Sequence, residues 1–221
     1  MTKSVSGAKI NQKQGRGFTQ KTKLKKMKKL LITGFEPFGG EKINPSLECV
    51  LALNEVIGGF LVEKLQIPTV FEKAFLAVKN KAYEINPDVI ICVGQAGGRR
   101  AITPELIAIN LKDAPIPDNE GNSPSLEKIC EDGENAYFTT LPVKTIAEKI
   151  KAENLPCQIS HSAGAFVCNE TFYHLLKEYH GSKVKVGFIH VPFLPSQVKN
   201  GEFSMPLEDI VKALTIAITA L

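Results

Sequence analysis

The sequence has 221 residues, of which 43% are hydrophobic and 7% aromatic, and it carries a formal net charge of +4. This length suits one sizeable hydrophobic core, and no apolar run approaches the roughly 20 residues of a membrane-spanning helix, so no membrane association is expected. The charge is unevenly distributed, because residues 1–29 hold ten of the 27 basic residues and no acidic residue, which leaves 17 basic and 23 acidic residues in the remaining sequence.

Residues 1–27 are expected to form a basic, disordered tail that precedes a folded body over residues 28–221. The segment is poor in apolar residues, and Phe18 is its only aromatic residue. A basic tail can bind nucleic acid, but a solvated appendage is the favoured interpretation, so no nucleic-acid partner is expected. The apolar run after the lysines, residues 30–32, is too short for the hydrophobic region of a signal peptide.

The cysteine pattern indicates a reducing compartment. Five cysteines form no C-x-x-C pair and no even framework, which predicts a cytoplasmic protein without structural disulfides. Cys157, His161 and Cys168 offer soft metal ligands, but their spacing fits no standard zinc pattern. We therefore expect no metal and no cofactor.

Strand-like and helix-like patterns alternate along the body. In chain order, the elements expected in the first half are a buried strand at residues 29–34, a helix at 45–55, a strand at 61–67, a helix at 70–85 and a buried strand at 89–93. The elements expected in the second half are a weaker strand at 106–111, a polar loop at 113–125, a helix at 145–153, a short strand at 158–160, a helix at 165–180, a strand at 184–190 and a helix from about 207. Strands separated by helices predict an α/β fold, with a largely parallel sheet covered on both faces.

Two glycine-rich segments follow apolar strands, at residues 34–40 and 94–98. The first has no Lys-Ser/Thr pair after its glycines, and the second has Ala96 where a dinucleotide-binding fingerprint requires glycine. A nucleotide site is therefore not expected, and we interpret both segments as places where the backbone approaches a ligand closely. Phe35 and Phe38 then either wall an apolar pocket or simply pack in the core.

Residues 162–172 contain a candidate nucleophile. Gly164 supplies a flexible turn, after which the apolar residues follow helical spacing, and this places Cys168 in the first turn of a helix. Unpaired backbone N–H groups and the positive end of the helix dipole lie there, and both favour a thiolate. The alternative is a small buried core cysteine, which this stretch by itself favours.

Two histidines are candidate bases, and one glutamate is a candidate partner. His190 lies at the carboxyl end of its strand, where open α/β sheets place their sites, whereas His161 is closer to Cys168 in the sequence. Glu105 could orient a histidine as the third member of a triad, although an exposed carboxylate in a Thr-Pro-Glu turn is the simpler interpretation. The residues alone leave these alternatives open.

Six segments in the same order resemble the pyrrolidone carboxyl peptidases (pyroglutamyl-peptidase I), a family of cysteine peptidases. The segments are residues 34–40, 94–99, 102–105 with 108–110, 118–122, 162–169 and 188–192, and the match runs from about residue 28 to 197. The resemblance implies one three-layer α/β/α domain around a twisted, largely parallel sheet. It also implies a peptidase that removes an N-terminal pyroglutamyl (5-oxoprolyl) residue from peptides, and a homotetramer.

The resemblance assigns roles to individual residues. It implies that Cys168 is the nucleophile, His190 the general base and acid, and Glu105 the residue that orients the imidazole, with a thioester intermediate. His161 does not match a catalytic position of the family. The positions that match the lining of the pyroglutamyl pocket are Phe35, Phe38, Thr69, Gln95, Ile116, Phe166 and Val167.

The sequence departs from the family at residue 115. The family usually has Asp-Ala-Arg before its Ile-x-Asp-Asn-Glu-Gly run, where this sequence has Asp113, Ala114 and Pro115. That arginine lies near the active site, and proline has neither a side-chain charge nor a backbone N–H. Since losing one oxyanion donor lowers a rate by about 10²–10³, the alternative function is a non-catalytic or weakly active protein that binds pyroglutamyl peptides.

Overall fold

The structure is a computed structural model that describes residues 1–2, 27–199 and 201–221. The basic tail expected over residues 1–27 therefore lies almost wholly outside the described residues. Within the described part of the chain, no helix has the length and apolar character needed to cross a membrane.

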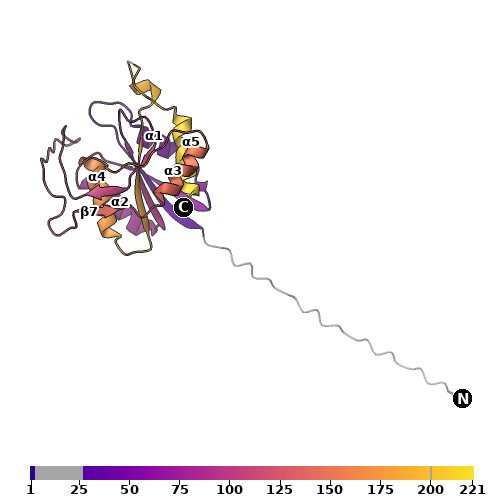
Figure 1. Cartoon of the computed structure of the whole chain (residues 1–221). Coiled ribbons are helices and arrows are strands. Elements are labelled where there is room, and N and C mark those ends of the chain that lie inside the picture. The colour runs from indigo at the N-terminus through magenta and orange to yellow at the C-terminus, as the bar shows by residue number, and fades with distance from the viewer. Residues whose placement is uncertain (3–26, 200) are drawn as a thin grey trace.

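A sheet forms the centre of the body (Figure 1). It has six strands in the order β2-β3-β1-β4-β8-β5. Its four parallel strands are, across the sheet, β3 (Phe60–Ile67), β1 (Lys28–Phe35), β4 (Val89–Gln95) and β8 (Lys185–Val191). The edge strands β2 (Val56–Ile57) and β5 (Thr103–Pro104) run antiparallel to β3 and β8. The expected largely parallel sheet is confirmed.

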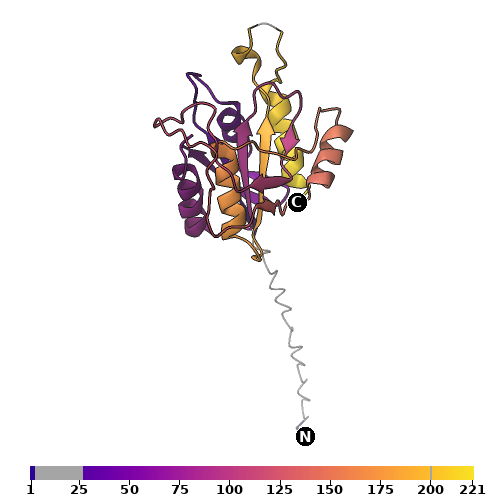
Figure 2. The same ribbon diagram turned by 60° about the vertical axis from the view of Figure 1, so that its left-hand side comes forward.

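Helices cover both faces of this sheet (Figures 1 and 2). One face carries α1 (Pro45–Ala52), α3 (Val143–Ala152) and α5 (Leu207–Thr219), and the other carries α2 (Lys73–Ile85) and α4 (Val167–Glu178). Side chains alternate between the two faces along β1, because Leu30 and Ile32 join one hydrophobic cluster while Leu31 joins the other. The expectation of an α/β fold with covered faces is confirmed.

Two helix starts show how local chemistry sets the boundaries. Helix α1 begins as expected, with Pro45 in its first turn and the Asn44 side chain accepting the backbone N–H of Ser46 at 3.0 Å. Helix α2, expected from residue 70, begins only at Lys73. Glu72 has a left-handed φ of 62°, so residues 70–72 form a loop rather than a helical turn.

The weakly patterned segments in the second half of the chain form other elements than the sequence predicts. The strand expected at residues 106–111 is reduced to β6 (Ile107–Ile109), which pairs with the unpredicted β7 (Ala136–Phe138) in a separate two-stranded sheet. The strand expected at 158–160 is not formed, and Cys157 and Ser160 make only isolated bridges. Segments this short carry too few alternating apolar residues for the pattern to reveal their pairing.

Close packing of α1 on β1 depends on Gly34. A Cβ at this position would lie 2.6 Å from both the Cα of Leu47 and the carbonyl oxygen of Ser46. Both are backbone atoms, so a change of rotamer cannot relieve the clash. The same approach lets the backbone N–H of Phe35 donate to Ser46 Oγ at 3.0 Å.

We predict that Gly34→Ala lowers the free energy of unfolding by about 3 kcal/mol, at the upper end of the usual range for overpacking. Urea unfolding followed by circular dichroism measures the change. Gly40→Ala is the control, because φ there is +82° and nothing lies within 4 Å of the added Cβ. This control introduces only backbone strain of about 1 kcal/mol. Equal losses in the two variants would contradict the steric explanation.

Candidate active site

Three parallel strands end at one edge of the sheet and bring candidate residues together there. β1 ends at Phe35, β4 ends at Gln95, and β8 carries His190 one residue before its end. The register pairs Gly94 with His190, so the two strand ends lie side by side. Open α/β sheets bind their ligands at this carboxyl edge.

A cavity of about 180 Å³ lies at this edge. Its lining residues are Phe35, Phe38, Asn44, Thr69, Gln95, Ala96, Arg99, Ala163, Gly164, Phe166, Cys168 and His190. The volume is well below the roughly 300–1,000 Å³ typical of sites for drug-sized ligands, so the cavity suits a small chemical group. Most residues expected from the sequence are therefore assembled around one small space.

Two residues expected to line the pocket lie elsewhere. Ile116 is 42% exposed, and its Cδ1 would lie 3.6 Å from a Cβ on Gly39, which places it beside the loop that carries Phe38. Val167 is fully buried in the cluster beneath α2 and α4. Neither side chain is among the lining residues of the cavity, so their contact with a ligand stays a prediction.

Cys168 sits in the first turn of α4, as its spacing predicted. A Cβ on Gly94 would lie 3.0 Å from Cys168 Sγ, so the sulfur rests against the strand residue that pairs with His190. A side chain at residue 94 would displace the sulfur. The close contacts at Gly94 are with protein side chains, and the close approach to a ligand expected for its segment stays a prediction.

Burial raises the pKa of the Cys168 thiol well above its ordinary value, and neighbouring Cys92 and Glu105 raise it further. The positive charge of Arg99 and a hydrogen bond from the Cys168 backbone act in the opposite direction. Burial in the structure thus opposes the thiolate that the helix position favours. A thiol that acts as a nucleophile requires a base, and His190 lines the same cavity.

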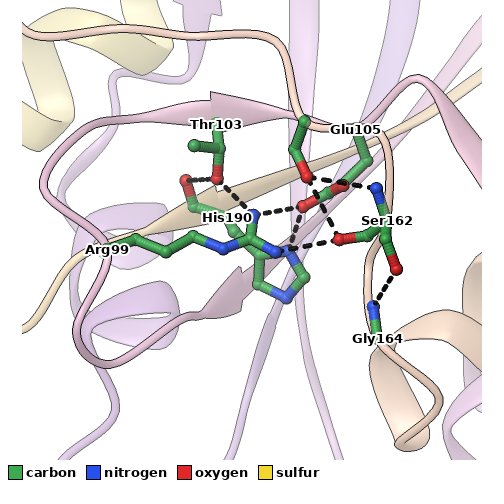
Figure 3. Close-up of polar contacts among 7 residues, drawn as sticks. Arg99, Thr103, Glu105, Ser162, Gly164 and His190 are labelled. Atoms are coloured by element: carbon green, nitrogen blue, oxygen red, sulfur yellow. Dashed lines mark hydrogen bonds and ion pairs between the residues drawn. The ribbon is translucent and has the colours of Figure 1, made fainter.

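His190 and Glu105 form the hydrogen bond that a triad requires (Figure 3). His190 Nδ1 lies 2.7 Å from Glu105 Oε1, and both side chains are buried. The edge strand β5 brings them together, because Thr103 pairs with His190 across the sheet. His161 is exposed and does not line the cavity, so the geometry favours His190 as the base.

Arg99 is a member of this cluster that the sequence did not single out. Its Nη1 donates to Glu105 Oε1 at 2.5 Å and to Thr103 Oγ1 at 2.7 Å, while Nη2 donates to the carbonyl oxygen of Ser162 at 2.9 Å (Figure 3). It thereby joins the buried carboxylate to the loop that leads into α4. The basic residue directly after the glycines of residues 94–98 was the available signal.

The pKa directions suit a base and its carboxylate partner. Burial opposes ionisation of Glu105, but hydrogen bonds from His190 and Arg99 outweigh it and lower the pKa of the carboxyl. Burial lowers the pKa of His190, although Glu105 acts against this effect. At neutral pH the imidazole is therefore neutral, with Nδ1–H donating to the carboxylate and Nε2 able to accept a proton.

The apolar wall of the cavity is built by loops that are held by hydrogen bonds to two carboxylates. The Phe166 ring packs against Phe38 and, edge-on, against Phe71, with centroid distances of 6.1 and 5.3 Å. Asp118 Oδ2 accepts the backbone N–H of Phe71 at 3.0 Å, and Glu170 Oε2 accepts that of Glu72 at 2.6 Å. The long loop at 113–125 and the first turn of α4 thus hold residues 70–72 in their non-helical conformation.

Asn169, which follows the nucleophile candidate, ties α4 to its surroundings. Its side chain accepts the backbone N–H of Ile109 at 3.0 Å and donates to the carbonyl oxygens of Ile109 and Leu111, each at 2.9 Å. The side chain is fully buried, and all three bonds are to backbone atoms. Sequence reasoning missed this role, because an asparagine inside a helix carries no pattern of its own.

Among the described residues, no group of three or more His, Cys, Asp or Glu side chains is arranged to hold a metal ion. All five cysteines are free. Cys157 is buried in the hydrophobic cluster that contains α3 and α5, away from the cavity that Cys168 lines. The arrangement at the carboxyl edge is that of a buried base with its carboxylate, a thiol and a small apolar cavity.

Comparison with known proteins identifies the relatives of this chain. The model of the pyroglutamyl peptidase family matches residues 28–221. The pyrrolidone-carboxylate peptidase of Clostridium perfringens (strain 13 / Type A) is 50% identical over 199 residues, which cover 87% of this chain and 92% of the relative. That of Lactobacillus acidophilus is 50% identical over 195 residues, which cover 87% and 98%.

Solved structures show the same fold. The crystal structure of Bacillus amyloliquefaciens pyroglutamyl peptidase I has a TM-score of 0.85 at 49% identity, covering 87% of this chain and 96% of that one. Pyrrolidone carboxyl peptidase from Thermococcus litoralis has a TM-score of 0.83 at 40% identity, covering 88% and 93%.

Glu170 makes stability depend on pH. Burial raises its pKa to about 7, although the Glu72 N–H and the charge of Lys112 partly oppose this. A carboxyl whose pKa is raised by folding contributes full stability below its unfolded pKa and loses that contribution as pH rises through the folded value. We predict that Glu170→Gln, which retains an oxygen for the Glu72 N–H, gains roughly 3 kcal/mol over wild type between pH 4.5 and pH 8.

Urea unfolding at both pH values measures this difference. The matched control is Glu178→Gln on the same helix, where hydrogen bonds from Tyr83 and Lys79 lower the pKa of the carboxyl. We expect Glu178→Gln to have a lower free energy of unfolding than wild type at pH 8, and the difference to be smaller at pH 4.5. A gain at pH 8 in both variants would show that the Glu170 result reflects net charge alone.

Proposed function

The chain belongs to the pyroglutamyl peptidase family, and we propose that it removes an N-terminal pyroglutamyl residue from peptides through Cys168, His190 and Glu105. The observation that carries this proposal is the placement of the thiol and the imidazole around one small cavity, with Glu105 Oε1 2.7 Å from His190 Nδ1. The order of nucleophile, base and orienting carboxylate is that of a catalytic triad.

The first half of the reaction forms a thioester. Neutral His190 takes the proton of the Cys168 thiol as the sulfur attacks the carbonyl carbon that joins the pyroglutamyl ring to the next residue. Glu105 stabilises the resulting imidazolium. His190 then gives the proton to the departing amine, the C–N bond breaks, and the shortened peptide leaves.

The second half releases the ring. Water attacks the thioester carbonyl while His190 accepts its proton, and the same proton returns to the sulfur as the C–S bond breaks. The product is pyroglutamate, and the thiol is restored. The proton that leaves with the peptide amine comes from Cys168, and the proton that restores the thiol comes from water, so His190 is neutral again at the end of each turnover.

Backbone N–H groups are the proposed oxyanion donors in this chain. Helix α4 has no side-chain cap at its N-terminus, so the N–H groups of its first turn are not engaged by a capping side chain. Pro115 is exposed and has no N–H, and the Arg99 guanidinium is committed to Glu105, Thr103 and Ser162. The α4 N-terminus therefore takes the oxyanion role without the arginine that the family usually has.

The cavity chemistry supports a neutral ring as the recognised group. A pyroglutamyl ring is a lactam without charge, so it needs apolar walls and a few polar contacts rather than an ion pair. Phe35, Phe38 and Phe166 supply the walls, and Gln95 and Thr69 supply polar atoms. An ordinary charged α-amino group would lose its hydration there without gaining an anionic partner, which disfavours normal peptide N-termini.

The assembly and location are further parts of the proposal. A homotetramer rests on the family resemblance, and a cytoplasmic location is supported by five cysteines that are all free. Residues 1–27 are proposed as a tail outside the catalytic domain, without a nucleic-acid partner.

We predict that Cys168→Ala lowers the release of a chromophore from a pyroglutamyl conjugate by a factor of about 10³ or more, because no other group can form the thioester. The matched control is Cys130→Ala, which removes a partly exposed thiol outside the cavity and leaves turnover unchanged. Retained turnover in Cys168→Ala would refute the assignment of the nucleophile. Wild-type binding of a pyroglutamyl peptide without turnover would instead support the non-catalytic alternative.

A further inference from the structure

The end of β8 continues into a short segment that contacts the wall of the cavity. The 3₁₀-helix η1 (Pro195–Gln197) follows the strand that carries His190. Within it, Gln197 Oε1 accepts the backbone N–H of Leu194 at 3.0 Å, and Gln197 Nε2 donates to Gln95 Oε1 at 3.1 Å. Gln95 lines the cavity. Three groups thus form one chain of hydrogen bonds that ends at the cavity wall.

The direction of this chain is determined by its first member. A backbone N–H can only donate, so Gln197 must present its oxygen to Leu194 and its nitrogen to Gln95. Gln95 must then present its oxygen to Gln197, because two amide nitrogens facing each other would be donor against donor. The Nε2 group of Gln95 is therefore the end of that amide left for a ligand.

The position of the Gln95 side-chain amide is fixed as well as its direction. The backbone N–H of Ala96 donates to the carbonyl oxygen of Val191 at 2.9 Å, which joins the end of β4 to the end of β8 beside the Gln197–Gln95 bond. The same pair of strands aligns Gly94 with His190. The amide of Gln95 is thus held at a defined place relative to the proposed base.

We propose that Gln197 is a positioning residue that makes Gln95 a hydrogen-bond donor to the lactam carbonyl oxygen of the pyroglutamyl ring. This inference rests on the proposed function. A lactam offers one carbonyl acceptor and one N–H donor, and a freely rotating glutamine could meet either of them. With its nitrogen held toward the ligand, Gln95 selects the carbonyl, which a prolyl ring lacks. Sites built on such a bond discriminate strongly against analogues that cannot make it.

Two substitutions of similar length separate this role from a merely structural one. In Gln197→Glu, a carboxylate oxygen still accepts the Leu194 N–H, but the other oxygen faces Gln95 as an acceptor. Gln95 must then turn its amide and present Oε1 to the ligand, opposite the lactam carbonyl. In Gln197→Met the bond is lost, yet Gln95 stays free to turn its nitrogen toward the ring.

The first measurement is ligand affinity without turnover. Pyroglutamyl-alanine is titrated calorimetrically into Cys168→Ala protein that carries each Gln197 variant. We expect the dissociation constant to rise about 100-fold with Gln197→Glu and about fivefold with Gln197→Met. In protein that also carries Gln95→Met, we expect Gln197→Glu to raise the dissociation constant by less than about twofold, because Gln197 acts only through Gln95.

The second measurement is catalysis in protein that retains Cys168. We expect Gln197→Glu to raise KM for the pyroglutamyl conjugate much more than it lowers kcat, and to leave the rate of Cys168 alkylation by iodoacetamide unchanged. Equal losses of affinity in the two Gln197 variants, or a full effect of Gln197→Glu in the Gln95→Met background, would overturn the inference.

The two proposals can fail separately. Suppose that the Gln197 variants bind pyroglutamyl-alanine with the predicted order of affinities, but that wild-type protein does not hydrolyse the conjugate. This result would refute the proposed reaction and support the role of Gln197. If wild-type protein hydrolyses the conjugate but the Gln197 variants do not show that order of affinities, only the proposed role of Gln197 is refuted.

Discussion

The buried carboxylate of Glu105 is the constraint on which the site depends. Its Oε1 receives both the His190 imidazole and the Arg99 guanidinium, at 2.7 and 2.5 Å. A buried charge is costly unless it is paired and hydrogen-bonded, so this carboxylate requires both partners at once. The two-residue strand β5 brings it beside β8, and Arg99 extends the same network to the loop before α4. The proposed base, its carboxylate and the loop before the proposed nucleophile are therefore positioned by one set of polar contacts.

Burial and the helix dipole act in opposite directions on the proposed nucleophile. A helix N-terminus stabilises a negative charge by roughly 0.3–1 kcal/mol, whereas burial can move a pKa by several units. The raised pKa of Cys168 is the expected result when both act on one sulfur. In the proposed reaction, charge then develops as the proton moves from Cys168 to a neutral His190.

The strongly patterned parts of the molecule could be predicted from the sequence, since β1, β4, β8 and α4 bury continuous or helically spaced apolar residues. The same patterns placed Cys168 and His190 at a helix start and a strand end. The start of α2 could not be predicted, because Glu72 owes its left-handed conformation to a hydrogen bond from its N–H to Glu170, 98 residues away. Arg99 donates to the carbonyl oxygen of Ser162, 63 residues away, and Gln197 donates to Gln95, 102 residues away. Local patterns carry no information about such partners. Glu105 was assigned only by resemblance for the same reason.

The long loop at residues 113–125 shows how this site can accommodate proline at residue 115. The loop is anchored on both sides of that position, because the Asp113 N–H donates to the carbonyl oxygen of Ala165 at 2.8 Å and Asp118 accepts the Phe71 N–H at 3.0 Å. The first bond holds the residues that enter α4, and the second holds the aromatic wall. Neither requires a side-chain charge or an N–H at residue 115. The first turn of α4, which we propose stabilises the oxyanion, is therefore positioned by contacts that a proline at residue 115 leaves intact.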